Sequence, residues 1–241
     1  MINEETRKPN SIFIDMQEIP YQILEAINVL RGNIQLSGYK LKVIAVTSAS
    51  IHEGKSTISF QLARSLAMLQ KTTLYIDCDI RNSMFKTRYN VVEATQGLSE
   101  FLAGNVGIHD IIYKIENEPY LDIIFAGAVA PNPSELLSSE IFEQMIKLAK
   151  KQYDYLIIDT PPVNAVIDGV LVAKHCDGTV LVVESEVTER AQAIRAQRKL
   201  EYAGVKILGA VLNKAGKGQK RYDYGYSYDK KKDKKKNGIP I

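Results

Sequence analysis

Residues 49–57 of this chain read Ala-Ser-Ile-His-Glu-Gly-Lys-Ser-Thr and directly follow the apolar run Leu41–Val46. This is the A-x-x-x-x-G-K-S form of a phosphate-binding loop, and it lies between a predicted strand and the amphipathic stretch Ser56–Leu69. Amides of such a loop form a nest for an anion, and the following helix points its positive N-terminal end at the same anion. The pattern therefore predicts a nucleotide-binding α/β domain.

The individual positions of the loop have separate roles. Gly54 lets the backbone approach a phosphate, Lys55 reaches the β- and γ-phosphates, and the Ser56 hydroxyl can ligate Mg²⁺. Ala49 occupies the first position, where glycine is common. His52 is expected to be an exposed loop residue, although a contact with phosphate is an alternative.

Further apolar segments alternate with helical ones along the chain. The strands are predicted at Leu41–Thr47, Thr73–Asp77, Leu121–Phe125, Tyr155–Asp159, Gly178–Glu184 and Ile207–Leu212. The helices are predicted at Tyr21–Gln35, Lys55–Gln70, Leu98–Leu102, Pro133–Lys151 and Thr188–Ala203. Strands that are apolar throughout favour a parallel sheet covered on both faces. We expect a doubly wound, mostly parallel sheet of the P-loop type, with ligands at the carboxyl ends of its strands.

The chain of 241 residues fits one large domain with tails. Residues 1–20 are predicted to be irregular, 21–213 to form the P-loop domain, and 214–241 to be a flexible tail rich in Tyr and Lys. No apolar run approaches the roughly 18–20 residues of a membrane span, and the N-terminus lacks the apolar core of a signal peptide. Cys78 and Cys176 are interpreted as reduced, buried thiols of a cytoplasmic protein.

Positive charge is concentrated at the C-terminus. The net charge is +3, and residues 214–241 carry ten Lys or Arg against three Asp, so the rest of the chain sums to 3 − 7 = −4. The domain itself is therefore not expected to bind nucleic acid.

Three carboxylates follow predicted strands. Asp77 and Asp79 close the second strand, and Asp159 ends the strand of the Asp-Thr-Pro-Pro motif, as in a Walker B segment. Such acids can hold Mg²⁺ or accept a proton from an attacking hydroxyl. Solvated strand-end acids are the simpler alternative, and the neighbouring phosphate loop makes it the weaker one. Asn213 can read the adenine edge or serve as a turn residue.

The segment Arg221–Asp229 carries tyrosines at every second position. From the residues alone, Tyr222, Tyr224, Tyr226 and Tyr228 are equally well interpreted as phosphoryl acceptors or as an aromatic tail that stacks on RNA or self-associates. The following Lys230–Lys236 run is expected to be solvated or to rest on anionic lipid.

Together these elements resemble the bacterial tyrosine kinases of capsule and exopolysaccharide synthesis, of the CpsD/CapB type. The resemblance covers nearly the whole chain. Beyond the phosphate loop and the tyrosine cluster, it includes Asp77–Arg81, Gly97–Gly104, Pro131–Leu137, Asp159–Pro162 and Leu208–Asn213.

The resemblance implies roles for these residues. The implied catalytic residues are Lys55, Asp77, Asp79 and Asp159, and the implied Mg²⁺ ligands are Ser56, Asp77 and Asp159. The implied ATP-binding residues are Ser50, Glu53, Gly54, Lys55, Ser56, Thr57 and Asn213. The tail tyrosines are implied to be autophosphorylated, largely between neighbouring subunits.

The resemblance also implies partners. A membrane-bound polysaccharide co-polymerase would anchor and activate the kinase at the inner face of the membrane, a cognate tyrosine phosphatase is possible, and the unphosphorylated chain would form a ring. The family's contact helix carries E-x-x-R-x-x-R, whereas this chain has Glu25, Asn28 and Arg31, so the middle arginine is missing. The family often has Pro-Gly at the positions of Ile51 and His52.

Two other classes compete with the kinase interpretation. A cell-division or partition ATPase of the same fold usually carries an extra lysine at the position of Ser50 and lacks the tyrosine tail. A non-catalytic ATP-binding adaptor would not need Lys55 together with all three carboxylates. The serine at position 50 and the tyrosine tail argue against the switch ATPase. Lys55 together with the three carboxylates argues against the adaptor, so a kinase is favoured.

Overall fold

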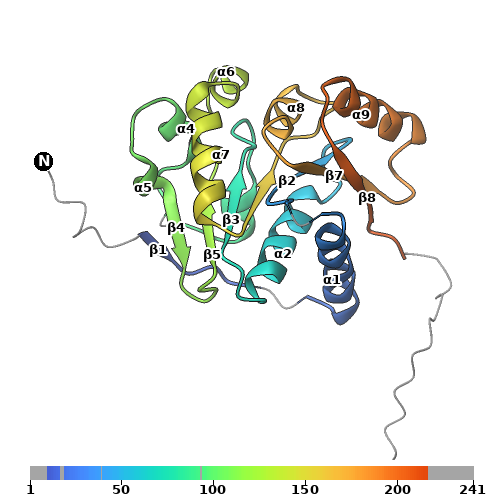
Figure 1. The fold of residues 1–241 in the computed structure, drawn as a ribbon, viewed down its shortest axis with the longest axis horizontal. Coiled ribbons are helices and arrows are strands. Elements are labelled where there is room, and N and C mark those ends of the chain that lie inside the picture. The colour runs from blue at the N-terminus through green and yellow to red at the C-terminus, as the bar shows by residue number, and fades with distance from the viewer. Residues whose placement is uncertain (1–9, 17–18, 39, 93, 217–241) are drawn as a thin grey trace, which may run out of the picture.

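The computed structural model describes residues 10–16, 19–38, 40–92 and 94–216. They form one sheet of eight strands in the order β1-β4-β5-β3-β6-β2-β7-β8, with helices on both faces (Figure 1). The strands are β1 (Asn10–Ile12), β2 (Val43–Ser48), β3 (Thr73–Asp77), β4 (Ile112–Ile115), β5 (Leu121–Ile124), β6 (Tyr155–Asp159), β7 (Gly178–Glu184) and β8 (Ile207–Asn213). Every pairing is parallel except that of β4 with β5.

The helices cover the sheet because successive strand residues point to opposite faces. Ile44, Tyr75 and Ile157 face α1 (Tyr21–Leu36) and α2 (Lys55–Ala67) in one core cluster. Leu74 and Ile158 face the opposite side, which is covered by other helices. These are α4 (Leu98–Leu102), α6 (Pro133–Leu137), α7 (Glu140–Gln152), α8 (Asp168–Ala173) and α9 (Arg190–Tyr202). The short helices α3 (Phe85–Arg88) and α5 (Ile108–Ile111) complete the set in the described residues.

The predicted doubly wound, mostly parallel sheet is confirmed, and β2 occupies its switch point. Strand β2 pairs with β6 on one side and β7 on the other, whereas β3, which follows α2 in the chain, lies beyond β6. Connections therefore leave β2 and β6 in different directions, and a crevice opens at their carboxyl ends.

Some predictions of local structure were incomplete. Strand β1 lies within the segment predicted to be irregular, and β4 was not predicted. The single helix predicted over Pro133–Lys151 is divided into α6 and α7, because Ser139 ends one turn and caps the next by accepting a hydrogen bond from Phe142 N (3.3 Å). Cys78 is buried but Cys176 is only half-buried, and both thiols are free.

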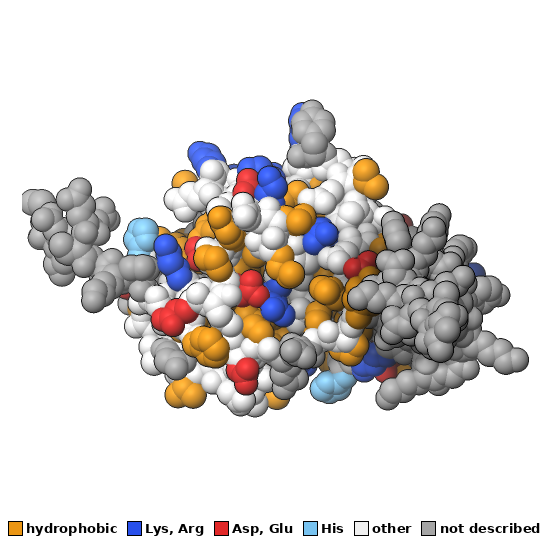
Figure 2. Space-filling view, turned by 90° about the horizontal axis from the view of Figure 1, so that it is seen from below, with side chains coloured by type: hydrophobic (Ala, Val, Ile, Leu, Met, Phe, Trp, Pro, Cys, Tyr) orange, Lys and Arg blue, Asp and Glu red, His pale blue; other side chains and the backbone are white. Residues whose placement is uncertain are grey.

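Charge of both signs is mixed on the visible surface. Figure 2 shows Lys and Arg side chains scattered among Asp, Glu and apolar side chains on one face, without a continuous basic patch there. None of the helices in the described residues has the length and apolar character that a bilayer crossing requires.

Candidate active site

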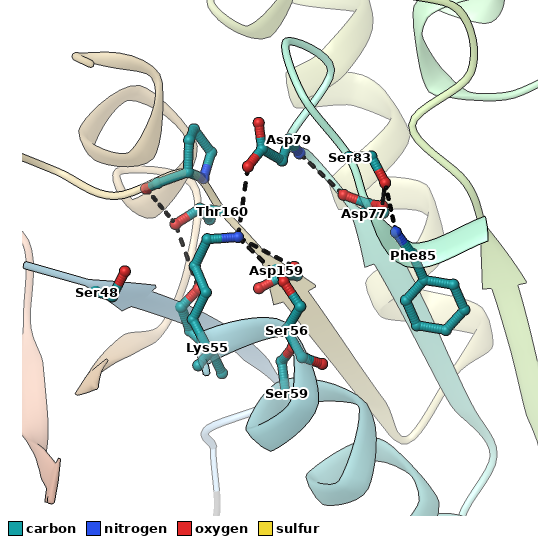
Figure 3. Close-up of polar contacts among 12 residues, drawn as sticks. Ser48, Lys55, Ser56, Ser59, Asp77, Asp79, Ser83, Phe85, Asp159 and Thr160 are labelled. Atoms are coloured by element: carbon teal, nitrogen blue, oxygen red, sulfur yellow. Dashed lines mark hydrogen bonds and ion pairs between the residues drawn. The ribbon is translucent and has the colours of Figure 1, made fainter. Parts of the chain in front are cut away.

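Three neighbouring strands bring the predicted loop and carboxylates to one edge of the sheet. The phosphate loop follows β2, while Asp77 and Asp159 end β3 and β6 and are paired directly across the two strands. Cys78 N donates to Asp159 O at 2.8 Å, which extends this pairing past the end of β3. Asp77 and Asp159 are each 1% exposed, so both carboxylates stand at the floor of the site (Figure 3).

The phosphate loop is held in shape by its own side chains and by two distant elements. Gly54 has φ of 89°, and a Cβ there would collide with the Asn213 amide, so glycine is required. Asn213 Nδ2 donates to Glu53 O at 2.8 Å. The buried Glu53 carboxylate accepts a hydrogen bond from Ser50 N at 2.8 Å and another from the Thr188 hydroxyl.

The Lys55 ammonium group lies between the carboxylates of Asp79 and Asp159. Its Nζ lies 3.4 Å from Asp159 Oδ2, 3.5 Å from Asp79 Oδ2 and 3.2 Å from Ser56 Oγ (Figure 3). Burial lowers the pKa of Lys55, but the charges of Asp159, Asp79 and Asp77 raise that pKa by more, so it lies above its ordinary value. The ammonium group is therefore kept charged, as a phosphate ligand must be.

The two buried carboxylates differ in what satisfies them. Asp77 accepts hydrogen bonds from Asp79 N (3.0 Å) and from the Ser83 hydroxyl. Burial, followed by the charge of Asp159, raises the pKa of Asp77 to about 7. Burial also raises the pKa of Asp159, against the lowering effect of Lys55. The two acids repel one another and titrate as a pair.

Asp159 Oδ1 is buried and has no hydrogen-bond partner among the described residues. An unsatisfied buried carboxylate oxygen is costly unless a cation or donor completes it. The Asp159 side chain shares the cleft with the Ser56 hydroxyl and with Asp77, its partner across the strands, and both are hard oxygen donors suited to Mg²⁺. The described residues contain no cluster of three or more His, Cys, Asp or Glu placed to hold a metal ion alone. This donor set fits Mg²⁺ that is shared with nucleotide phosphates.

A cleft of about 560 Å³ opens over these groups. Of the predicted residues, Gly54, Lys55, Ser56, Thr57, Asp77, Asp79, Asp159 and Asn213 line it. The side chains of Ser50 and Glu53 are instead engaged within the loop and with α9, where Ser50 Oγ lies 3.3 Å from Gln192 Oε1. His52 is exposed at the rim with φ of 65°.

The predicted subunit-contact residues lie on α1, away from the cleft. Glu25 is exposed and accepts a hydrogen bond from Asn28 Nδ2 at 3.1 Å. Arg31 is half-buried and donates to Ser65 O of α2 at 2.8 Å. Within one subunit, Asn28 therefore takes the position of the missing arginine and binds Glu25 directly. The phosphoacceptor candidates Tyr222–Tyr228 lie outside the described residues.

Sequence reasoning missed several residues of the site. Ser83, Met84 and Arg88 line the cleft from the segment after β3, although they form no motif. Arg81, which appeared in the sequence only as the end of the Asp77–Arg81 segment, donates to the buried Asp168 (Nε to Oδ2, 2.5 Å) and to Ser134 (3.0 Å), and so fixes the loop that carries Asp79. Arg81 and Asp168 are far apart in the sequence and share no motif, so the sequence did not predict this contact.

Comparison with known proteins gives relatives that cover most of the chain. A family model described as an AAA domain matches residues 41–191. Tyrosine-protein kinase CpsD of Streptococcus agalactiae is 41% identical over 213 residues, which are 88% of this chain and 92% of that protein. Tyrosine-protein kinase YwqD of Bacillus subtilis is 36% identical over 84% of this chain and 85% of that protein.

Solved structures agree with this placement. The kinase domain of Escherichia coli tyrosine kinase ETK superposes with a TM-score of 0.78 at 30% identity, covering 88% of this chain and 87% of that one. The septum site-determining protein MinD of Pyrococcus horikoshii, complexed with Mg-ADP, superposes with a TM-score of 0.62 at 22% identity over 74% of this chain and 72% of that one. The second likeness is one of fold alone.

Proposed function

The chain belongs to the bacterial tyrosine-protein kinases with an AAA-type domain, and we propose that it transfers the γ-phosphoryl group of ATP to its own C-terminal tyrosines. The observation that carries the proposal is Lys55 Nζ, held inside the cleft 3.4 Å from Asp159 and 3.5 Å from Asp79. The acceptors are Tyr222, Tyr224, Tyr226 and Tyr228, which share one short segment.

The chain's own residues would bind and orient the nucleotide. The loop amides from Gly54 onward and the N-terminal end of α2 face the β- and γ-phosphates, and Lys55 neutralises their charge. Asn213, which already contacts the loop, is proposed to lie at the adenine edge. Ser56, Asp77 and Asp159 would hold Mg²⁺, and the unpaired Asp159 Oδ1 supports that assignment. When bound, the metal ion neutralises charge that develops on the transferring phosphoryl group.

The transfer step is an in-line displacement. The tyrosine oxygen forms a bond to the γ-phosphorus while the bond from that phosphorus to the β,γ-bridging oxygen breaks, and ADP leaves with the electron pair. The phenolic proton passes to the Asp77–Asp79 pair. Positioning and charge neutralisation by Lys55 supply most of the rate enhancement.

Phosphorylation would feed back on assembly. Each phosphate adds roughly −1.5 to −2 charge, so several phosphates offset the surplus of seven positive charges in residues 214–241. We infer that the unmodified chain forms a ring through α1, with Glu25 and Arg31 at the contact, and that phosphorylation loosens it. Equal oligomer masses for the phosphorylated and unmodified chains would overturn this part of the proposal.

The proposed setting is polysaccharide synthesis. A membrane-bound co-polymerase would present an activating cytoplasmic segment and hold the kinase at the inner face of the membrane. The kinase would then regulate polymerisation and export of capsular or exopolysaccharide, and a cognate phosphatase would reset the tail. The names of the CpsD relatives support this setting.

The testing experiment is an in vitro reaction with MgATP, with and without the cytoplasmic segment of the candidate membrane-bound co-polymerase. Intact-mass spectrometry and fragment mapping follow, with Lys55→Met as the control. The proposal predicts successive phosphoryl additions within Tyr222–Tyr228 that the control lacks. ATP consumption without mass gain, even with the activating segment, would favour a switch ATPase of the MinD fold.

A further inference from the structure

One wall of the nucleotide cleft carries an apolar side chain and a cation that the transfer of phosphate itself does not use. Met84 and Arg88 both line the cleft together with Lys55 and Asp77. Met84 is 54% exposed, although it is a large apolar residue. An exposed apolar side chain beside buried charges is a feature that a ligand would cover.

A short segment after β3 connects these two side chains to the reacting groups. The Ser83 hydroxyl binds Asp77, so the residue before Met84 is fixed beside the proposed proton acceptor. Met84 caps α3 and Arg88 is its last residue, with Arg88 N donating to Met84 O at 2.9 Å. Asp77, Met84 and Arg88 all line the same cleft.

Arg88 has donors to spare. Its Nη1 donates to Thr57 Oγ1 at 2.6 Å, at the start of α2. No carboxylate in the described part of the chain forms an ion pair with it. A guanidinium group has five N–H donors in a planar fork that suits a carboxylate, so the exposed Arg88 side chain has donors left for a ligand in the cleft.

We propose that Met84 and Arg88 form the acceptor-tyrosine subsite, in which Met84 contacts the tyrosine ring and Arg88 binds a carboxylate next to that tyrosine in the sequence. The proposal rests on the proposed autokinase function. Sulfur–aromatic contacts of this kind are favourable, and Arg88 lines the same cleft as Asp77, where the tyrosine oxygen would lie. The acceptor segment fits, because Asp223 separates Tyr222 from Tyr224 and Asp229 follows Tyr228.

The test measures the coupling between Arg88 and the acidic neighbour of the tyrosine. The enzyme is the full chain with Tyr222, Tyr224, Tyr226 and Tyr228 replaced by Phe, so that it does not compete with added substrate. The substrates are two synthetic peptides of residues 221–229 in which only Tyr224 is kept and the other tyrosines are Phe. One peptide has Asp223 and Asp229, and the other has Asn at both positions.

We expect Arg88→Gln to lower kcat/KM for the acidic peptide about tenfold, the effect of losing one charged contact of about 1.4 kcal/mol. The effect should appear in the KM for the peptide, with the KM for ATP unchanged. The Asn peptide should react at one low rate with both enzymes, and Arg88→Lys should keep part of the preference. Arg198→Gln is the matched control, since Arg198 is exposed and lies outside the cleft.

Other results would overturn the inference. If Arg88→Gln slows both peptides equally, or raises the KM for ATP, Arg88 acts on the nucleotide or on Thr57 and not on the acceptor. If the enzyme that keeps Met84 and Arg88 shows no preference for the acidic peptide, the subsite does not exist. If this enzyme consumes ATP but phosphorylates neither peptide, and the wild-type chain does not phosphorylate its own tail, the proposed function fails as well, and this outcome is separate from the first two.

Discussion

Two hollows in the described part of the chain differ in what lines them, and the larger of these two is not where the catalytic groups lie. A groove of about 770 Å³ lies between the segment 163–170 and α9, lined mainly by aliphatic side chains with Arg195, Arg198 and Lys199 among them. The nucleotide cleft measures about 560 Å³ and contains a buried ammonium group and two buried carboxylates. The larger volume would point to the groove as the functional site. The buried charges point to the cleft, in agreement with the sequence motifs.

The difference has a physical cause. Burying a charge is expensive unless it is paired, so a fold keeps buried ions mainly where a ligand or reaction uses them. The cleft carries this cost at Asp159 Oδ1, which lacks a partner. In the groove, Lys199 Nζ donates to Val163 O at 2.9 Å, and the remaining cations stay exposed. The groove therefore involves no free-energy cost of buried unpaired charge, and its presence does not require a catalytic role.

The largest expected effect comes from removing the central charge of the cleft. Lys55→Met should lower the rate of phosphotyrosine formation by about 10²–10³-fold or more, because a charged group in contact with the transferred phosphoryl is lost. Arg198→Met makes the same change of cation to thioether in the groove and should leave the rate unchanged. Initial rates at saturating MgATP compare the two. Equal losses would mean that the hollows do not differ in function.

A second comparison uses two glycines with left-handed backbone. Gly54 in the loop (φ 89°) meets Asn213, whereas Gly204 after α9 (φ 73°) has open space around it. Gly204→Ala should cost only the backbone strain, about 1–2 kcal/mol of unfolding free energy. Gly54→Ala should cost more and should also abolish ATP binding. Urea unfolding measures the unfolding free energy and titration measures the ATP affinity. Normal ATP affinity in Gly54→Ala would contradict the role assigned to Gly54 in the phosphate loop.

A third prediction concerns pH. The pKa of Asp77 is raised from 3.8 to about 7 in the folded chain, so between these values the folded state binds more protons than the unfolded state, and stability falls as pH rises. Asp77→Asn removes this loss. In metal-free buffer the variant should match the wild type near pH 4 and exceed it by on the order of 1–3 kcal/mol at pH 8. Urea unfolding at several pH values checks this, and a gain that is largest at low pH would refute it.

The smallest expected effect belongs to the groove. Lys199→Ala removes the hydrogen bond to Val163 O, and Val163 N in turn donates to Ser48 O at 3.0 Å beside the phosphate loop. The loss of unfolding free energy should be about 0.5–1.5 kcal/mol, with ATP affinity unchanged. Thermal unfolding and ATP titration provide the measurements. A marked fall in ATP affinity would show that the two hollows are coupled.

The same contrast explains what the sequence could predict. The phosphate loop, Asp77 and Asp159 are local signals, because each lies at the end of an apolar strand and neighbouring parallel strands must bring such ends together. Other contacts form only when the chain folds, and no sequence motif marks their partners. These are the Arg81–Asp168 contact, the Ser83–Asp77 contact and the position of Arg88 at the cleft. Strand β4 was missed because its alternation extends over only four residues, Ile112–Ile115, and is continuous with α5.

The most direct test of the account separates the cleft from the acceptor. A Lys55→Met chain with its native tail is mixed with a chain that has an intact cleft but Phe at Tyr222, Tyr224, Tyr226 and Tyr228, and MgATP is added. Intact-mass spectrometry resolves the two chains. We expect phosphoryl groups on the tail of the Lys55→Met chain, delivered by the other chain's cleft, and none on either chain incubated alone. Phosphate on the Lys55→Met chain alone, or no transfer in a mixture that consumes ATP with the activating segment present, would contradict it.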